Sequence, residues 1–228
     1  YQYWSFVIFS SQLNAYLLLQ KTQKTVMPKV LNPDASYTFH SYFEMRYNIA
    51  DILADLGFRY DRRRLDLPAS DRAFSVARIE ETLERNLRYA DPSSEAARRE
   101  ILIAPILIEL CELIDARLDI EYPIAVSNWL KGAIDYRVVT ASSIVIVEAK
   151  QADLTHGFVQ LAAELIALDL WIDVETPHLY GAVTTGEDWR FGILDRTEKQ
   201  ITQDITLYRV PENVEQLLRI LIAVSEVK

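Results

Sequence analysis

One short segment of the sequence joins a buried strand to two side chains with complementary chemistry. Residues 144–147 are all apolar and β-branched, which is typical of a buried strand, and Glu148-Ala149-Lys150 follows directly. Side chains two residues apart on a strand point to the same face, so we expect the Glu148 carboxylate and the Lys150 ammonium side by side. An acid and an amine at a strand end are typical of a site that handles a cation or an oxyanion.

A second carboxylate is predicted opposite the first. The polar stretch 140–143 is typical of a four-residue loop between two strands. In a hairpin closed by that loop, Val139 pairs with Ile144, and Asp135 lies opposite Glu148. Directly opposite Cβ atoms are about 5 Å apart, so the two carboxylates could share one cation.

Two carboxylates this close raise each other's pKa unless a cation compensates. Mg²⁺ suits such a place, because it takes oxygen ligands and keeps waters for a substrate phosphate. Lys150 could then orient or deprotonate the attacking water, or neutralise charge on the phosphate. The alternative is a structural ion pair, in which Lys150 neutralises Asp135 or Glu148 at a strand end.

The surrounding pattern predicts the elements that position these residues. Strands are expected over 118–126, 130–139, 144–149, 178–184, 189–194 and 201–210, with a strand or extended arm over 58–67. Helices are expected over 39–56, 154–168 and from 212 to about 224, and another from Asp91 to Leu113 with a kink or break at Pro105. This order predicts an α/β (α+β) fold with a central mixed β-sheet covered by helices on both faces.

The paired strands resemble the PD-(D/E)XK nuclease superfamily, whose signature is an aspartate on one strand and D/E-x-K at the end of the next. Asp135 and Glu148-Ala149-Lys150 match that signature. The likeness is strongest to the N-terminal nuclease domain of type I restriction enzyme motor subunits, and it covers most of residues 91–195.

Further motifs occur in the order that this family has them. Glu95, Arg99, Ile103 and Pro105 stand at the spacing of its helical E-x-x-x-R-x-x-x-I-x-P motif. Residues 121–123 and 132–136 resemble the family's lead-in to its metal-binding aspartate, Gln160 matches a glutamine of the next helix, and residues 184–189 resemble a T-x-G-x-x-W hairpin. Together these motifs are fairly specific for the restriction endonuclease-like fold.

The resemblance implies an activity and a site. It implies Mg²⁺, with Mn²⁺ as a substitute, held by Asp135, Glu148, Glu95 and the backbone carbonyl of Ala149, and catalytic roles for Glu95, Asp135, Glu148, Lys150 and Gln160. The expected activity is that of a metal-dependent endonuclease that hydrolyses phosphodiester bonds in DNA, in restriction or repair. A catalytically silent nucleic-acid-binding or regulatory module on the same fold is the alternative, and a metal-free scaffold is a third hypothesis.

Some matched residues also have simpler explanations. Glu95 and Glu100 both lie near a helix start, where the dipole favours any acid, and the spacing from Arg99 to Pro105 selects Glu95. Arg99 could simply pair with Glu95, four residues earlier.

The same holds for the glutamine and the aromatic residues. Gln160 could be an exposed helix residue, although Gly157, Gln160 and Glu164 share a face that would let backbone or substrate approach. Tyr136 and Trp189 are expected to be core aromatics.

The charge distribution limits where nucleic acid could bind. The net charge is −9, and residues 100–228 carry 10 basic against 21 acidic groups, which favours the silent module. Arg59, Arg62, Arg63 and Arg64 form the dense basic cluster, so we expect them, with Arg99, to contact a phosphate backbone. A solvated strand edge that discourages aggregation is the alternative for this cluster.

The remaining residues restrict cofactors and compartment. Cys111 lies in an apolar run and has no second cysteine to bridge, which fits a small buried hydrophobe in a reducing cytoplasm. His40, His156 and His178 lack metal-ligand spacing, so zinc is not expected. Without a glycine-rich phosphate loop, no nucleotide cofactor is expected.

Three parts are expected along the chain. They are an N-terminal extension over 1–26, a helical and arginine-rich segment over 27–90 packed on the core, and a nuclease-like core over 91–228. The extension is mainly apolar but interrupted by polar residues, so no membrane span is expected, with a hydrophobic anchor as the alternative. A double-strand break would need two sites and hence a homodimer.

Overall fold

A computed structural model describes residues 29–140, 143–173 and 176–226 of the chain. The predicted extension over 1–26 and part of the predicted loop over 140–143 therefore lie outside the described residues. In the part of the chain that is described, no helix has the length and apolar character needed to cross a bilayer.

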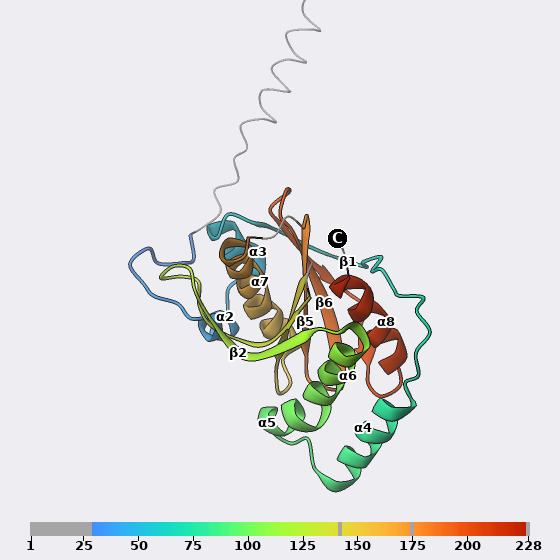
Figure 1. Ribbon diagram of the computed structural model, residues 1–228. Helices are drawn as coiled ribbons and strands as arrows, with labels where there is room; N and C mark the ends of the chain where they lie inside the picture. The colour runs from blue at the N-terminus through green and yellow to red at the C-terminus, as the bar shows by residue number, and fades with distance from the viewer. Residues whose placement is uncertain (1–28, 141–142, 174–175, 227–228) are drawn as a thin grey trace, which may run out of the picture.

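A mixed eight-stranded sheet forms the centre of the fold (Figure 1), as predicted. The strands are β1 (Arg59–Arg63), β2 (Arg117–Ala125), β3 (Lys131–Val139), β4 (Ile144–Ala149), β5 (His178–Thr184), β6 (Asp188–Asp195), β7 (Gln200–Asp204) and β8 (Tyr208–Arg209). Their order is β1-β7-β6-β5-β4-β3-β2, and β8 pairs with β6. The β1–β7 and β4–β5 pairs are parallel and the others antiparallel, so β1 and β2 are the two edges.

Helices cover both faces of this sheet (Figure 1). They are α2 (Phe39–Glu44), α3 (Ile49–Asp55), α4 (Ala77–Tyr89), α5 (Glu95–Arg98), the π-helical segment η1 (Arg99–Ile103), α6 (Ala104–Ile114), α7 (Leu154–Trp171) and α8 (Val214–Ser225). One apolar core lies between the sheet and α4, α6 and α8, and the other lies between the sheet and α2, α3 and α7.

The central strand β4 is buried along its whole length, because helices cover it on both sides. The chain then crosses over through α7 to reach β5, which lies parallel to β4, and such a connection needs a helix of this kind. This crossover brings the first turns of α7 over the end of β4, where Glu148 and Lys150 lie.

Strand prediction succeeds where apolar runs are bounded by turn residues. The predicted strands over 144–149 and 178–184 are confirmed at both ends. The T-x-G-x-x-W segment forms the β5–β6 turn, where the Trp189 indole N–H donates to the carbonyl of Gly186 at 3.1 Å. Trp189 and Tyr136 are buried core aromatics, as expected. The strand predicted over 201–210 is instead divided into β7 and β8.

The helix predicted over 39–56 is wrong as a single element. The chain leaves α2 at Met45, which has extended backbone angles, and α3 begins after Asn48. The Asn48 side chain accepts a hydrogen bond from the Ala50 N–H at 2.9 Å, so it caps a new helix. Gly57, with φ of 84°, follows the end of α3 as predicted.

The helix predicted from Asp91 begins later, because the Ser94 hydroxyl accepts from the Ala97 N–H and caps α5. The break expected at Pro105 takes the form of η1, a π-helical turn just before that proline. The helix α4 was not predicted, and its amphipathic stripe packs Ile79 and Leu83 on the core.

We predict that Gly192→Ala destabilises the protein by about 1–3 kcal/mol, the usual cost of overpacking a core. A Cβ at this position would lie 2.7 Å from Cε2 and 2.8 Å from Cζ of Phe158, a fully buried ring on α7. Urea unfolding of Gly192→Ala, Phe158→Leu and the double variant tests the contact, because Phe158→Leu should reduce the cost of the added methyl. Strictly additive losses would contradict this packing.

Candidate active site

The predicted pairing of the two acidic strands is confirmed. Val139 pairs with Ile144 and Tyr136 with Val147, and the ladder ends there, one position before the predicted pair of Asp135 and Glu148. The Asp135 Oδ2 atom accepts a hydrogen bond from the backbone N–H of Ala149 at 2.8 Å. This bond holds the aspartate across the end of β4, while the Ala149 methyl packs into the opposite core.

Glu148 is the centre of a buried polar cluster. Its side chain is 1 % exposed, and the Lys150 ammonium forms an ion pair with its Oε1 atom. The Gln160 amide donates to the same oxygen at 2.7 Å and to Glu164 Oε1 at 2.9 Å. Glu148 Oε2 and Glu164 Oε2 are buried and accept no hydrogen bond from a nitrogen or hydroxyl group, but the two carboxyl groups share a hydrogen bond with each other. The alternative of an exposed Gln160 is therefore wrong, because this side chain is buried between two acids.

The cluster opens into a cavity of about 310 Å³. The five residues predicted to be catalytic all line it, namely Glu95, Asp135, Glu148, Lys150 and Gln160. Glu100 is exposed and does not line this cavity, which agrees with the choice of Glu95 over it. Residues far apart in the sequence, on α5, β3, β4 and α7, thus converge on one space.

Gly157 lets α7 approach the end of β4. A Cβ at this position would lie 2.8 Å from Lys150 Cγ and 2.8 Å from Val183 Cγ2. The helix begins at Leu154 and is capped by Asp153, whose side chain accepts from the N–H groups of Thr155 and His156. The face predicted to allow close approach, with Gly157, Gln160 and Glu164, is therefore the face that contacts the cluster.

Burial dominates the electrostatics of the acids. It raises the pKa of Glu148 well above its usual range, and the nearby carboxyl groups of Glu164 and Asp135 raise it further. Burial also raises the pKa of Glu164, to about 8. The pKa of Asp135 is raised by burial, although the Ala149 N–H and Arg99 oppose the shift. Burial opposes the charge on Lys150, but the Glu148 carboxylate outweighs it and raises the pKa of the amine.

The side-chain oxygens of the cavity provide some, but not all, of the ligands that a hard cation needs. Glu148 Oε2 is a buried oxygen that accepts from no nitrogen or hydroxyl group and contacts only the Glu164 carboxyl, and Asp135 lies on the adjoining strand. Within the described ranges, no three His, Cys, Asp or Glu side chains are grouped closely enough to hold a metal ion by themselves. A cation here would therefore rely on Asp135 and Glu148 and take backbone, water or substrate oxygens for the rest, as Mg²⁺ commonly does. The role of Glu95 as a third ligand and of the Ala149 carbonyl as a fourth stays a prediction.

Arg99 is held in the cavity by Glu121 and Asp135 rather than by Glu95. Its Nη1 atom lies 2.6 Å from Glu121 Oε1 and 3.6 Å from Asp135 Oδ1, and its guanidinium lies 5.2 Å from the Tyr136 ring centroid. The alternative that Arg99 pairs with Glu95 is therefore wrong, because its guanidinium is engaged by Glu121 and Asp135 instead. Arg99 neutralises Asp135 in part, and its predicted contact with nucleic acid stays a prediction.

The four clustered arginines do not form one surface at this cavity. They lie on and just after β1, an edge strand that β7, β6 and β5 separate from β4. Arg59 pairs with Glu198 at 2.9 Å and Arg63 with Asp61 at 3.0 Å, while Arg64 is exposed. These three fit the alternative of a charged strand edge, and Arg62 alone of the four lines a hollow next to α7.

Two further acids belong to the site but were given no role from the sequence. Glu164 stands with Gln160 in an otherwise apolar stretch of α7 in which every residue from 157 to 168 is buried. A carboxylate in such a stretch is a signal that could have found it, because a buried acid requires partners. Glu121 has a left-handed φ of 54°, which no sequence pattern predicted.

Comparison of the chain with protein-family models, with curated proteins and with solved structures finds no match.

The raised pKa of Glu164 predicts a pH-dependent stability. Unfolded, this acid ionises near its usual value of 4.5, whereas in the fold its pKa is about 8. Between these values the folded protein keeps a proton that the unfolded chain has released. The free energy of unfolding should therefore fall as pH rises from about 5 to 8, by at most about 1.4 kcal/mol per pH unit for one proton.

Urea unfolding at a series of pH values tests this assignment. Glu164→Gln removes the titrating group and should make the decline shallower, whereas the exposed Glu84→Gln should follow the wild type. An unchanged decline in Glu164→Gln would show that this carboxyl is not the group responsible.

Proposed function

We propose that this chain is a Mg²⁺-dependent nuclease of the restriction endonuclease-like kind that hydrolyses phosphodiester bonds in DNA. The observation that carries the proposal is the convergence of Asp135, Glu148 and Lys150 on one cavity, from two paired strands. The order of motifs in the sequence supports the choice of DNA as the substrate.

Asp135 and Glu148 would hold the ion, since their strands are paired and one oxygen of Glu148 contacts only the Glu164 carboxyl, whose proton a cation would replace. A bound Mg²⁺ would supply Lewis-acid polarisation of the phosphate and a water of lowered pKa. Gln160 and Glu164 position Glu148 from the side of α7, and the hydrogen bonds of Gln160 fix the orientation of its carboxylate.

Lys150 has the most direct catalytic role for a side chain of this chain. Its ammonium lies against Glu148 in a largely buried position, so it keeps its charge near neutral pH. There it can donate hydrogen bonds to the attacking water or to a non-bridging phosphate oxygen as negative charge develops. Arg99, on the opposite wall, can neutralise a second phosphate oxygen when the substrate displaces one of its acids.

A second candidate is a catalytically silent nucleic-acid-binding or regulatory module on the same fold. It is favoured by the ion pairs of the site, because Lys150 neutralises Glu148 and Arg99 neutralises Asp135 in part without a metal. Buried pairs of this kind also occur for structural reasons alone.

A cleavage assay separates the two candidates. We expect wild-type protein to cut single- or double-stranded DNA with Mg²⁺ or Mn²⁺, and to stop when EDTA is added. Lys150→Ala should lower the rate at least about 100-fold, because the side chain stabilises charge that develops in the transition state. Lys29→Ala, which alters an exposed lysine outside the cavity, is the matched control and should cut like the wild type.

Circular dichroism of Lys150→Ala would verify that the variant is folded. DNA binding by the wild type without any metal-dependent cleavage would contradict the nuclease and support the silent module.

A further inference from the structure

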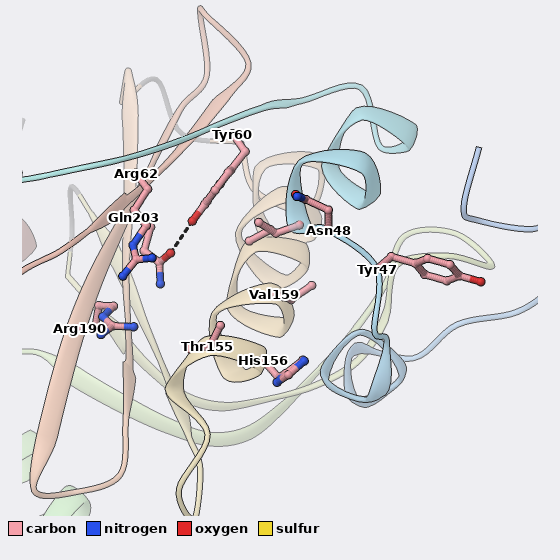
Figure 2. A pocket seen from close by; sticks show the side chains of 10 residues that line it. Tyr47, Asn48, Tyr60, Arg62, Thr155, His156, Val159, Arg190 and Gln203 are labelled. Carbon is pink, nitrogen blue, oxygen red and sulfur yellow. Dashed lines mark hydrogen bonds between the residues drawn. The ribbon is translucent and has the colours of Figure 1, made fainter. Parts of the chain in front are cut away.

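A second hollow lies on the same face of the sheet as α7 (Figure 2), and of the residues that line it the sequence analysis gave a role only to Arg62. Its volume is about 350 Å³, and β1, β6, β7, the first turns of α7 and the loop after α2 form its walls. Arg62 from β1 and Arg190 from β6 lie along the sheet side of this hollow, with His156 on the helix side.

The two arginines are without acid partners. Among the described residues, neither guanidinium forms an ion pair or a side-chain hydrogen bond, and Arg190 Nε is buried with no partner. Arg62 is exposed and Arg190 is half-buried, whereas the largely buried arginines Arg98, Arg99 and Arg137 each pair with a carboxylate, so the lack of a partner is unusual for Arg190 alone. Burial lowers the pKa of Arg190, and the nearby charge of Arg62 lowers it further.

The acids nearest to Arg190 form their hydrogen bonds with other groups, although one buried oxygen of Asp204 has no partner. Asp188 pairs with Arg209 at 3.1 Å, and Asp204 Oδ1 accepts from the backbone N–H groups of Leu65 and Thr206. Asp153, the N-cap of α7, accepts from the Thr155 N–H and pairs with His156, which lines the hollow. These acids reduce the repulsion between the two arginines, but none of them pairs with either guanidinium.

Neutral donors surround the same space. The Tyr60 hydroxyl donates to Gln203 Oε1, which fixes the amide with its oxygen toward the tyrosine (Figure 2). The Gln203 amide nitrogen then remains as a donor next to Arg62 and Arg190. Two guanidiniums and an amide without acceptors are the complement of a phosphate group, whose oxygens only accept.

The hollow adjoins the candidate active site. Phe43 lies between the two spaces, with its ring centroid 5.0 Å from Lys150 Nζ and 6.3 Å from the ring centroid of His156. Phosphates follow each other every few ångströms along a nucleic-acid strand, so one strand could reach both spaces within a few nucleotides.

We propose that Arg62, Arg190 and Gln203 bind a phosphate group, and that this phosphate belongs to a nucleic-acid strand that passes Phe43 toward Asp135 and Glu148. The path of the strand rests on the proposed nuclease function, whereas phosphate binding in the hollow does not. Arg62 and Arg190 would then position substrate rather than take part in the chemistry.

Binding of a fluorescently labelled single-stranded oligonucleotide in EDTA, which prevents cleavage, tests the proposal. Arg62→Gln and Arg190→Gln should each weaken binding about tenfold or more, and should make the dependence of affinity on salt less steep. Arg59→Gln is the matched control on the same strand, and it should bind within about twofold of the wild type because Glu198 already neutralises this arginine. Thermal unfolding should show neither Arg62→Gln nor Arg190→Gln destabilised, because each removes a repelling charge.

A second arm uses inorganic phosphate and a nucleoside monophosphate as competitors, to distinguish a strand from a free ligand. The proposal is supported if these competitors displace the oligonucleotide from the wild type but not from Arg62→Gln or Arg190→Gln, and both variants also bind the oligonucleotide more weakly. If the variants no longer respond to the competitors but bind the oligonucleotide like the wild type, the path of the strand through this hollow would be overturned. Wild-type binding of every probe by both variants would overturn the phosphate site as well.

Different results would contradict the nuclease function and the phosphate site. Metal-dependent cleavage that Lys150→Ala abolishes, with normal oligonucleotide binding by Arg62→Gln and Arg190→Gln, would overturn this inference and keep the nuclease. A wild type that does not cleave, but whose oligonucleotide binding needs both arginines, would support the phosphate site and contradict the nuclease.

Discussion

The burial of the Glu148 carboxyl is the constraint on which the site depends. Removing an ionised carboxylate from water costs several kcal/mol unless charges and donors compensate for it. Lys150 and Gln160 supply a charge and a donor on one oxygen of Glu148, and the Glu164 carboxyl shares a hydrogen bond with Glu148. The surrounding fold is arranged around this group, because Gly157 lets α7 come close and Asp135 is held opposite by the Ala149 N–H.

This arrangement requires the middle of the sheet rather than its edge. Helices cover β4 on both faces, so its end is shielded from solvent while the adjoining cavity remains accessible. The crossover through α7 places Gln160 and Glu164 over the strand end, and the π-helical turn at Arg99 brings a guanidinium to the opposite wall. Four separate elements thus contribute to one polar space. At a solvated edge of the sheet, by contrast, an acid pair would have ordinary pKa values and would bind a cation weakly.

Much of this could be predicted from the sequence, because the features that carry it are local. The strand over 144–149 and the register that sets Asp135 against Glu148 follow from period-two patterning and a short polar loop. The break in the helix at Asn48, the left-handed Glu121 and the π-helical turn depend on capping and tertiary packing, which periodicity does not encode. The arginine run was misleading for a similar reason, since adjacency in sequence does not show which guanidiniums have acid partners: Glu198 reaches Arg59 from 139 residues away.

The central claim is that Asp135 and Glu148 together hold a hard divalent cation, and direct Mn²⁺ binding measured by electron paramagnetic resonance tests it most directly. The wild type should bind Mn²⁺ and lose it to excess Mg²⁺, while Asp135→Asn and Glu148→Gln, verified as folded, should each weaken binding at least about tenfold. Equal Mn²⁺ binding by the wild type and both variants, or none by the wild type at millimolar Mn²⁺, would contradict the account and leave Lys150 and Glu148 as a structural ion pair.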